Sequence, residues 1–292
     1  MSPSPLPSSK HVSGLLTRMA APEPLLATEL RPPPSDLDTA GSMDSWIDMH
    51  HTLRRLVAQD TVVFLTDNAV GKREEENLGH LTANLQPEDR ERVVPFLTCK
   101  HPLDYCLMYA ARAASAGFKG LCVLGGDRHV GPPRCVEHAY ELRQRIRERV
   151  PQLVLGGWAN PHQDPARQVG YLLEAEATAD FYLTQVVSHH DLPKVEAFLE
   201  EAERQGLTLP GLFGVFYYRS ARARTLRTLA EFLPVPIEPL TEEFSAGAKA
   251  EDVCERTLAG LRGLGVSRVY LSNLGHQSMV GRMRSLRRTF SD

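Results

Sequence analysis

Eight short apolar runs, each followed by a longer stretch, limit the fold of this chain more than any other feature of its sequence. Several runs, such as TVVFLT from Thr61 to Thr66, are apolar at nearly every position, which is typical of strands buried on both faces of a parallel sheet. The predicted strands are Leu25–Leu30, Thr61–Asp67, Val93–Cys99, Gly120–Asp127, Gln152–Ala159, Asp180–Val186, Gly211–Tyr218 and Val266–Asn273.

Amphipathic patterns between these runs predict helices. DYCLMYAARAASAG repeats apolar residues at helical spacing and ends on Gly117, and LPKVEAFLEEAERQG does the same before Gly206. Eight strand–helix units in one chain predict a single (βα)8 barrel over residues 23–292, with an open doubly wound sheet as the alternative. Residues 1–22 are rich in Ser and Pro, and we expect them to form a flexible arm.

Charge and composition exclude several classes of partner. A net charge of -3 and a pI of about 6.4 give no basic field for nucleic acid. No apolar run approaches the roughly 20 residues of a membrane span, so no membrane partner is expected. Five scattered cysteines without a CxxC pair favour free thiols in a reducing cytoplasm. The oligomeric state is not indicated by the sequence.

Polar residues occur at or just beyond the end of each predicted strand. The carboxyl ends of barrel strands form one rim, where the chemistry of this fold lies, so these side chains should converge there. They are Glu29, Thr66, Asp67, Thr98, Asp127, Trp158, Asn160, His162, Thr184, Gln185, Tyr218, Arg219, Ser272 and Asn273.

Three of these residues allow more than one interpretation. Asp127 follows two glycines and would cap a helix in the ordinary case, but the next helical pattern is delayed to about Arg134, which favours a functional role. Gln185 sits inside a buried strand, where its amide either bonds a neighbouring strand or recognises a heterocycle. Strand alternation sends one of Tyr217 and Tyr218 towards the barrel mouth.

No metal site is predicted. His189, His190 and Asp191 are adjacent, and adjacent side chains seldom converge on one ion, so we interpret them as a polar loop that opens a helix. A second possible metal site consists of His129, Cys135 and His138, but it lacks the fourth ligand that zinc needs.

The order of the rim motifs resembles the methylenetetrahydrofolate reductase family, whose catalytic domain is a (βα)8 barrel. The resemblance runs from about residue 25 through nearly all of the remaining chain, and it implies reduction of 5,10-methylenetetrahydrofolate to 5-methyltetrahydrofolate with hydride from NADH or NADPH. The matching motifs are TELRPPP, FLTDNAVG, PFLTCKH, VLGGD, ANPH, YLTQ and PGLFGVFYYRS.

The resemblance also implies roles for individual residues. Glu29 matches the general acid whose proton lets the five-membered ring open to a 5-iminium cation, a task suited to an acid on a partly apolar strand. Asp127 matches the carboxylate that holds the pterin and stabilises the developing cation. Gln185 matches the amide that reads the folate, and Tyr218 an aromatic that packs on it.

The remaining rim residues follow from the same resemblance. Arg219 stands where the family has a lysine and is expected to meet the anionic folate tail, and Thr98 is expected on the substrate side. The residues expected to bind the hydride donor are Thr66, Asp67, Trp158, Asn160 and His162.

This chain departs from the family at the flavin site. The family's flavoenzymes have a histidine at the position of Phe96, and they have Arg-Gly-Asp where Gly125–Asp127 stands here. Their Tyr-Pro-Glu-x-His motif is replaced by Trp158–His162, and their phosphate-binding lysine has no counterpart, since no lysine occurs between Gly120 and Pro193. We therefore expect no FAD and a direct hydride transfer from the nicotinamide.

Two other functions fit the same motifs. One is a flavin-dependent version of the same reduction. The other is a folate-binding barrel without redox chemistry, either a methyltransferase or a regulatory protein. Glu29 discriminates between reduction and binding, because binding without ring opening has little need of an acid at that position.

Overall fold

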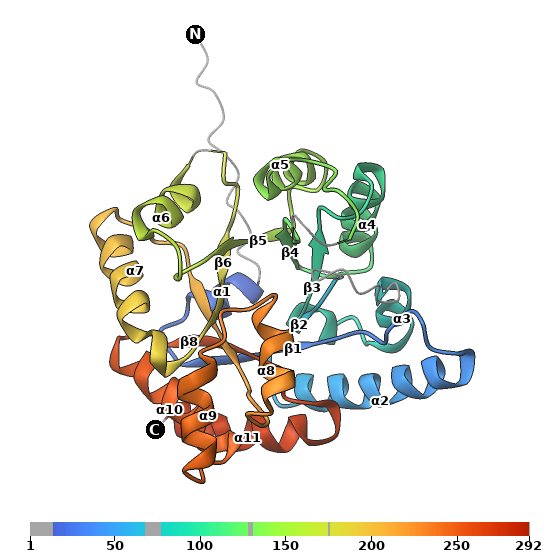
Figure 1. The fold of residues 1–292 in the computed structure, drawn as a ribbon. Coiled ribbons are helices and arrows are strands. Elements are labelled where there is room, and N and C mark those ends of the chain that lie inside the picture. Colours follow the sequence, from blue (N-terminus) through green and yellow to red (C-terminus); the bar gives the residue numbers. More distant parts are fainter. Residues whose placement is uncertain (1–13, 68–76, 128–130, 175, 292) are drawn as a thin grey trace.

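Eight parallel strands form a closed barrel in the computed structural model, which describes residues 14–67, 77–127, 131–174 and 176–291. Each strand pairs with the next, and β1 also pairs with β8, which closes the sheet (Figure 1). This confirms the (βα)8 barrel and excludes the open sheet. The strands are β1 (Leu25–Leu30), β2 (Val63–Leu65), β3 (Val93–Thr98), β4 (Gly120–Leu124), β5 (Val154–Ala159), β6 (Phe181–Val187), β7 (Gly211–Phe216) and β8 (Arg268–Ser272).

Helices surround the barrel, and two of them, α8 and α9, are additional to the regular crossover α10 between β7 and β8 (Figure 1). The α-helices are α1 (Gly14–Ala20), α2 (Thr39–Val57), α3 (Asn77–Asn84), α4 (Leu103–Ser115), α5 (Ala139–Arg149), α6 (Pro165–Leu173), α7 (Leu192–Arg204), α8 (Ala223–Ala230), α9 (Ile237–Ser245), α10 (Ala250–Gly263) and α11 (Met279–Ser291). The described residues also form the short 3₁₀ helices η1 (Asp89–Arg92), η2 (His189–Asp191) and η3 (His276–Ser278).

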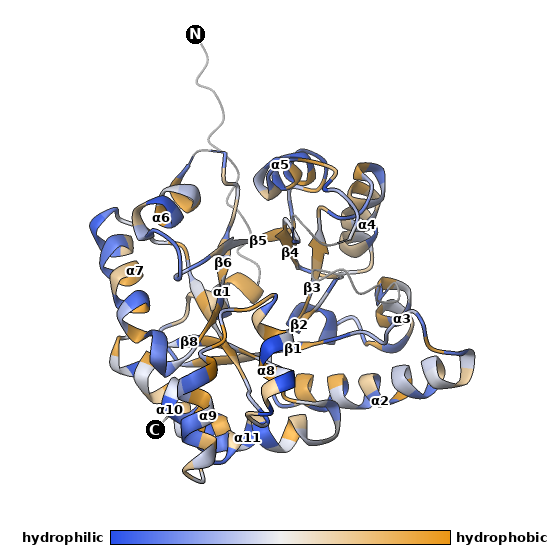
Figure 2. Cartoon of the chain, viewed as in Figure 1, coloured by the Kyte–Doolittle hydropathy of each residue, from blue (hydrophilic) through white to orange (hydrophobic). Residues whose placement is uncertain are grey.

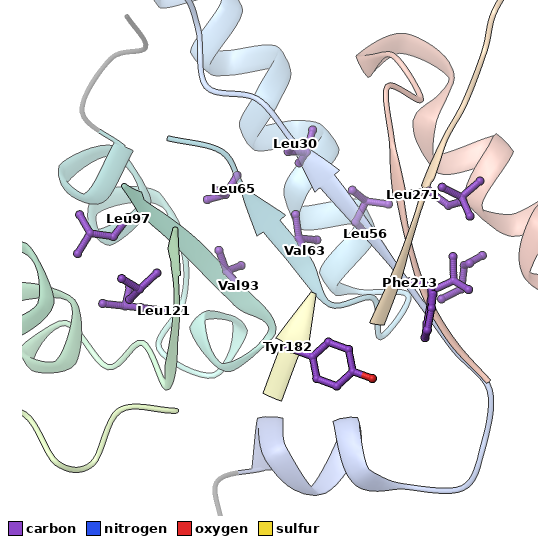
Figure 3. Packing of buried hydrophobic residues seen from close by; sticks show 14 of the residues in the cluster. Leu30, Leu56, Val63, Leu65, Val93, Leu97, Leu121, Tyr182, Phe213 and Leu271 are labelled. Atoms are coloured by element: carbon purple, nitrogen blue, oxygen red, sulfur yellow. The ribbon is translucent and has the colours of Figure 1, made fainter. Parts of the chain in front are cut away.

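Side chains alternate between two apolar layers along each strand, as the period of two requires. On β1, Leu26 and Leu30 face outward and pack between the strands and the helices, in the layer shown in Figure 3. Leu25 and Ala27 face the barrel interior with Phe64 and other inward side chains. The strands are therefore hydrophobic on both faces, whereas most of the surrounding helices also carry hydrophilic residues (Figure 2).

Helix α1 closes the amino-terminal end of the barrel. Leu15 and Met19 on this helix are 2% and 0% exposed and belong to the interior cluster. A Cβ atom on Gly120, at the start of β4, would lie 2.6 Å from Leu15 Cδ2, so the glycine permits this close approach. The prediction of a flexible arm over residues 1–22 is corrected for residues 14–20 alone, which form helix α1 and pack against the barrel interior. Residues 1–13 lie outside the described part.

Directly below the rim, a bonded set of side chains ties three strands together. Tyr270 donates its hydroxyl to the Thr184 carbonyl at 2.6 Å, and Gly214 N–H donates to Thr184 Oγ1 at 3.0 Å. A Cβ at Gly214 would lie 2.6 Å from the Tyr270 hydroxyl, so the ring lies directly against the β7 backbone. Beside this set, the β6–β7 register shifts between Leu183 and Val186, and the resulting bulge carries Gln185.

All five cysteines have free thiols, in agreement with the sequence-based prediction. Among the helices in the described part of the chain, none is long and apolar enough to cross a membrane.

Replacing Met19 by alanine is expected to lower the free energy of unfolding by about 2–5 kcal/mol, because truncating a fully buried side chain leaves a cavity. Met43 on α2 is 58% exposed and provides a matched control, for which a change within about 0.5 kcal/mol is expected. Urea denaturation of both variants measures the difference. If both substitutions lowered the free energy of unfolding equally, the packing of α1 against the barrel would be contradicted.

Candidate functional site

Glu29 projects into the barrel mouth from the carboxyl end of β1. It follows Leu25 and Ala27 on the inner face and pairs in register with Phe64 of β2, another interior residue. Ser272, at the end of β8, donates its hydroxyl to Glu29 Oε1 at 3.1 Å. Glu29 is half-buried, and its charge acts on the buried Tyr270 in the layer below, whose pKa is raised first by burial and then by this carboxylate. The acid therefore stands between the apolar interior and the open rim.

Asp67 organises the ends of β2 and β3. Its Oδ2 accepts hydrogen bonds from the Thr98 backbone N–H at 2.7 Å and from the Thr98 hydroxyl at 3.0 Å. Its Oδ1 lies 2.7 Å from His101 Nε2. Thr98 is fully buried, so both of its donors are used within the protein, and Thr66 is 9% exposed with its N–H bonded to the Leu30 carbonyl. These contacts shape the rim at the two strand ends.

His101 is half-buried beside Asp67. Burial lowers the pKa of His101, but the hydrogen bond to Asp67 and the charge of that carboxylate outweigh it and raise the pKa above its ordinary value. The imidazole also packs against Tyr105 of α4, with ring centroids 4.7 Å apart and planes tilted by 33°. The pair is thus an acid–base unit at the rim, on the strand next to the one that bears Thr66.

Two basic side chains cover the glycines that precede Asp127. Gly126 has a φ of +72°, which ends β4 and directs the chain towards Asp127. A Cβ at Gly126 would lie 2.8 Å from Lys100 Cγ, and one at Gly125 would lie 2.7 Å from the Arg134 guanidinium carbon. Lys100 donates to the Pro132 carbonyl at 2.9 Å, and Arg134 donates to the Gly126 carbonyl. Asp127 is half-buried, three strands around the barrel from Glu29.

The amide of Gln185 is oriented by its own strand. Val186 N–H donates to Gln185 Oε1 at 2.9 Å, and the Thr184 hydroxyl donates to the Gln185 carbonyl at 2.9 Å. Gln185 is half-buried at the bulge. The sequence allowed the amide either to bond a neighbouring strand or to recognise a heterocycle. In the structure its oxygen accepts a hydrogen bond from the next residue of its own strand.

Trp158 lies near the end of β5, and Asn160 and His162 lie in the loop that follows it. Trp158 is half-buried and packs on the interior cluster from the inner face. Asn160 Oδ1 accepts from the His162 backbone N–H at 3.1 Å, which forms a local turn. His162 Nε2 lies 2.9 Å from the Val186 carbonyl, and its Nδ1 lies 3.7 Å from Asp191 Oδ1. These contacts hold the β5 loop against the β6 bulge.

Tyr218 and Arg219 lie beyond the end of β7. Alternation predicts that one of Tyr217 and Tyr218 faces inward, and it is Tyr218, whereas Tyr217 packs in the outer layer under Arg282. However, Tyr218 is only 4% exposed and packs on Phe216 beneath α8, α9 and α10, so its ring is covered and not open to the mouth. Arg219 is exposed and donates to Asn273 Oδ1 at 3.0 Å.

Sequence reasoning missed three basic groups at the rim: Lys100, His101 and Arg134. Lys100 and His101 directly follow β3, so the rule that placed Thr98 at the rim also applies to them. Arg134 carries no comparable signal, because it reaches the rim from a loop ten residues after β4 ends. Asp191 was assigned to a polar loop, and it is a buried carboxylate bonded to Ser188 and close to His162.

No protein-family model matches this chain, and no curated protein sequence matches it. Solved structures do match. An uncharacterised protein from Clostridium thermocellum that binds two copies of 5-methyl-5,6,7,8-tetrahydrofolic acid superposes with a TM-score of 0.67, at 12% identity, over 94% of this chain and 97% of that one. Tryptophan synthase from M. tuberculosis superposes with a TM-score of 0.50, at 12% identity, over 97% and 98% of the two chains.

A Schiff-base-forming fructose-1,6-bisphosphate aldolase also matches, with a TM-score of 0.50 at 12% identity, over 95% of this chain and 99% of that one. At such low identities these likenesses establish the fold alone. The chain is a TIM barrel, and several enzymes share this architecture.

Substituting Asp67 with asparagine is expected to lower the pKa of His101, because burial then acts on the imidazole without the opposing carboxylate. In the wild type, the raised pKa stabilises the fold below the ordinary histidine pKa, and that contribution disappears as pH rises through the raised value. NMR titration of the histidine ring protons measures both pKa values. Asp164→Asn, at the distant cap of α6, is the control and should leave His101 unchanged. Identical His101 titrations in wild type and Asp67→Asn would contradict the pairing.

Proposed function

We propose that this protein reduces 5,10-methylenetetrahydrofolate to 5-methyltetrahydrofolate with hydride taken directly from NADH or NADPH. The observation that carries the proposal is the position of Glu29: an acid on the inner face of β1, bonded to Ser272 and set at the boundary of the apolar interior. The folate-binding barrel from Clostridium thermocellum, which shares the fold over nearly the full length of both chains, supports a folate as the substrate class.

The chemistry needs one proton and one hydride. Glu29 donates its proton to the departing nitrogen of the five-membered ring, directly or through a water molecule, and the ring opens to a 5-iminium cation. The C4 hydride of the nicotinamide then adds to the iminium carbon, which becomes the methyl group. Substrate, NAD(P)H and one proton give 5-methyltetrahydrofolate and NAD(P)⁺, so atoms and electrons balance without a further oxidant or reductant.

Asp127 and Gln185 are the groups we assign to the pterin. A carboxylate at Asp127 opposes the positive charge that develops on the iminium, which is an electrostatic contribution to the transition state. The fixed amide of Gln185 reads the heterocycle with its nitrogen, since its oxygen is bonded to Val186. We assign Arg219, which is exposed at the β7 end, to the anionic tail of the folate.

The hydride donor is assigned to the β2–β3 and β5 sectors of the rim. The indole of Trp158 supplies a half-exposed flat surface for the nicotinamide. Thr66, Asp67, Asn160 and His162 act mainly by fixing the shape of that sector through the hydrogen bonds described above.

Two features support hydride transfer without flavin. Phe96, which stands where flavoenzymes of the resembling family have a histidine, is 4% exposed and packs with Phe64, with ring centroids 5.9 Å apart, in the apolar interior. An arginine at position 125, as in the flavin motif, would collide with Arg134 as it lies here. Neither Phe96 nor Gly125 offers the polar side chain that the resembling flavoenzymes have at that position.

The direct test is an anaerobic assay of purified protein with 5,10-methylenetetrahydrofolate and each nicotinamide, without and with added FAD. We expect a colourless protein that oxidises NADH or NADPH only when folate is present and gains nothing from FAD. Activity that requires FAD would contradict direct transfer while leaving the reduction itself intact. Folate binding without any nicotinamide oxidation would replace the reductase by a non-redox folate-binding barrel.

Glu29→Gln is expected to reduce the turnover number by about 10²-fold or more, because general acid catalysis typically contributes 10²–10⁴-fold. Folate affinity should change little, since glutamine keeps the size of the side chain and can still accept the Ser272 hydrogen bond. Steady-state kinetics and folate binding by calorimetry give the two quantities.

The control variant is Glu23→Gln, an exposed acid just before β1, which should behave as the wild type. A Glu29→Gln enzyme with near wild-type turnover would remove Glu29 from the proposed mechanism.

A further inference from the structure

A second cluster of reactive side chains lies outside the rim residues assigned to the folate reaction. Glu243 of α9 reaches the η2 turn, where its Oε1 lies 2.6 Å from His189 Nε2 and 2.7 Å from His190 Nε2. The carboxylate and the histidines are separated by more than 50 residues in sequence, so the contact depends on the fold. The two adjacent imidazoles lean together, with ring centroids 4.0 Å apart and planes at 41°.

The hydrogen bonds of Thr257 favour one tautomer of His189, with the hydrogen on Nδ1 and none on the Nε2 atom that faces Glu243. The Thr257 hydroxyl donates to the Val253 carbonyl at 3.1 Å, so its oxygen is left to accept. His189 Nδ1 lies 3.0 Å from that oxygen and therefore carries the donated hydrogen. With its hydrogen on Nδ1, a neutral His189 has none on Nε2 to donate to Glu243 Oε1, 2.6 Å away, so this contact calls for either a proton or a metal ion between the two atoms.

We propose that His189, His190 and Glu243 bind a divalent transition-metal ion, with Zn²⁺ as the ion that this donor set suits best. Two imidazole nitrogens and one carboxylate oxygen form a ligand set typical of zinc sites that keep an open position. One ligand atom from each residue lies within 4.8 Å of the others. Bonds of about 2.1 Å would place tetrahedral ligand atoms about 3.4 Å apart, so the histidine–carboxylate contacts would widen by less than about 1 Å.

Outer contacts hold the three ligands in place. Arg256 of α10 donates to Glu243 Oε2, the oxygen that does not face the histidines, and Thr257 orients His189. Metal-binding histidines commonly have their second nitrogen hydrogen bonded in this way. The η2 turn is itself fixed, because the Ser188 hydroxyl donates to Asp191 Oδ2 at 2.7 Å.

An open pocket of about 560 Å³ adjoins the cluster and is lined by the two histidines, Glu243, Arg256 and residues 246–248. The fourth coordination position faces this pocket, which makes it accessible to water or to a small ligand. The ion would connect η2, which follows β6, to α9 in the segment between β7 and β8. The sequence analysis predicted no metal here, because Glu243 lies 54 residues after His189 and belongs to no motif that contains the histidines.

The test uses the full chain without a polyhistidine tag, stripped of metal with a chelator. Calorimetric titration with Zn²⁺, together with elemental analysis after desalting, should give one ion per chain, and Co²⁺ should give the visible absorption bands of a four-coordinate site. His190→Ala and Glu243→Gln should each weaken Zn²⁺ binding by about 100-fold or more, since even changes to outer contacts cost roughly 10–100-fold. Zn²⁺ should raise the melting temperature of the wild type and not that of these variants.

His51→Ala is the matched control, since it removes an exposed imidazole from the other adjacent histidine pair, on α2, and should bind Zn²⁺ as the wild type does. Circular dichroism checks that each variant folds; if one does not, the other decides, and if neither does, the stoichiometry and cobalt spectrum of the wild type decide. A wild type that takes up no ion, or a His190→Ala protein that binds equally tightly, would overturn the proposal. None of these results depends on folate reduction.

Discussion

The pairing of β1 with β8 is the constraint on which the rest of the structure depends. Because these two strands are parallel and in register from Leu25 and Arg268 onward, the sheet closes, and every second side chain must point inward. The same alternation that buries Leu25 and Ala27 carries Glu29 into the mouth next to Ser272. Regular strand geometry is therefore enough to direct the Glu29 side chain into the barrel mouth.

Buried apolar side chains pack in the interior beneath the rim, and aromatic rings form the floor of the site. Phe64 contacts Phe96, Phe181 and Tyr270, and Tyr270 bonds the β6 backbone where the bulge begins. At the opposite end, α1 seals the barrel. Charges at the rim therefore meet an apolar surface on one side and the opening on the other, a setting in which electrostatic groups act more strongly than in water.

Much of this architecture was predictable, because buried parallel strands leave a strong signal: β1 was predicted with the bounds it has, and Glu29 and Thr98 were placed at strand ends. Predictions failed where a contact depends on segments distant in sequence. Alternation predicted that one of Tyr217 and Tyr218 faces inward, but nothing local indicates that α8–α10 cover the ring of Tyr218. Helix α1 was not predicted, because its few apolar residues lie close to a segment rich in proline and serine. His101 gains its raised pKa only when Asp67 of another loop reaches it.

The central claim is that hydride passes from the nicotinamide to the folate without an intermediate carrier. It is tested most directly by turnover with NADH or NADPH deuterated at the transferred C4 position, in ordinary water and with no flavin added. If transfer is direct, the deuterium will appear in the methyl group of 5-methyltetrahydrofolate without loss to solvent. Reduced flavin exchanges its hydrogen with water, so a product methyl group without deuterium would contradict direct transfer.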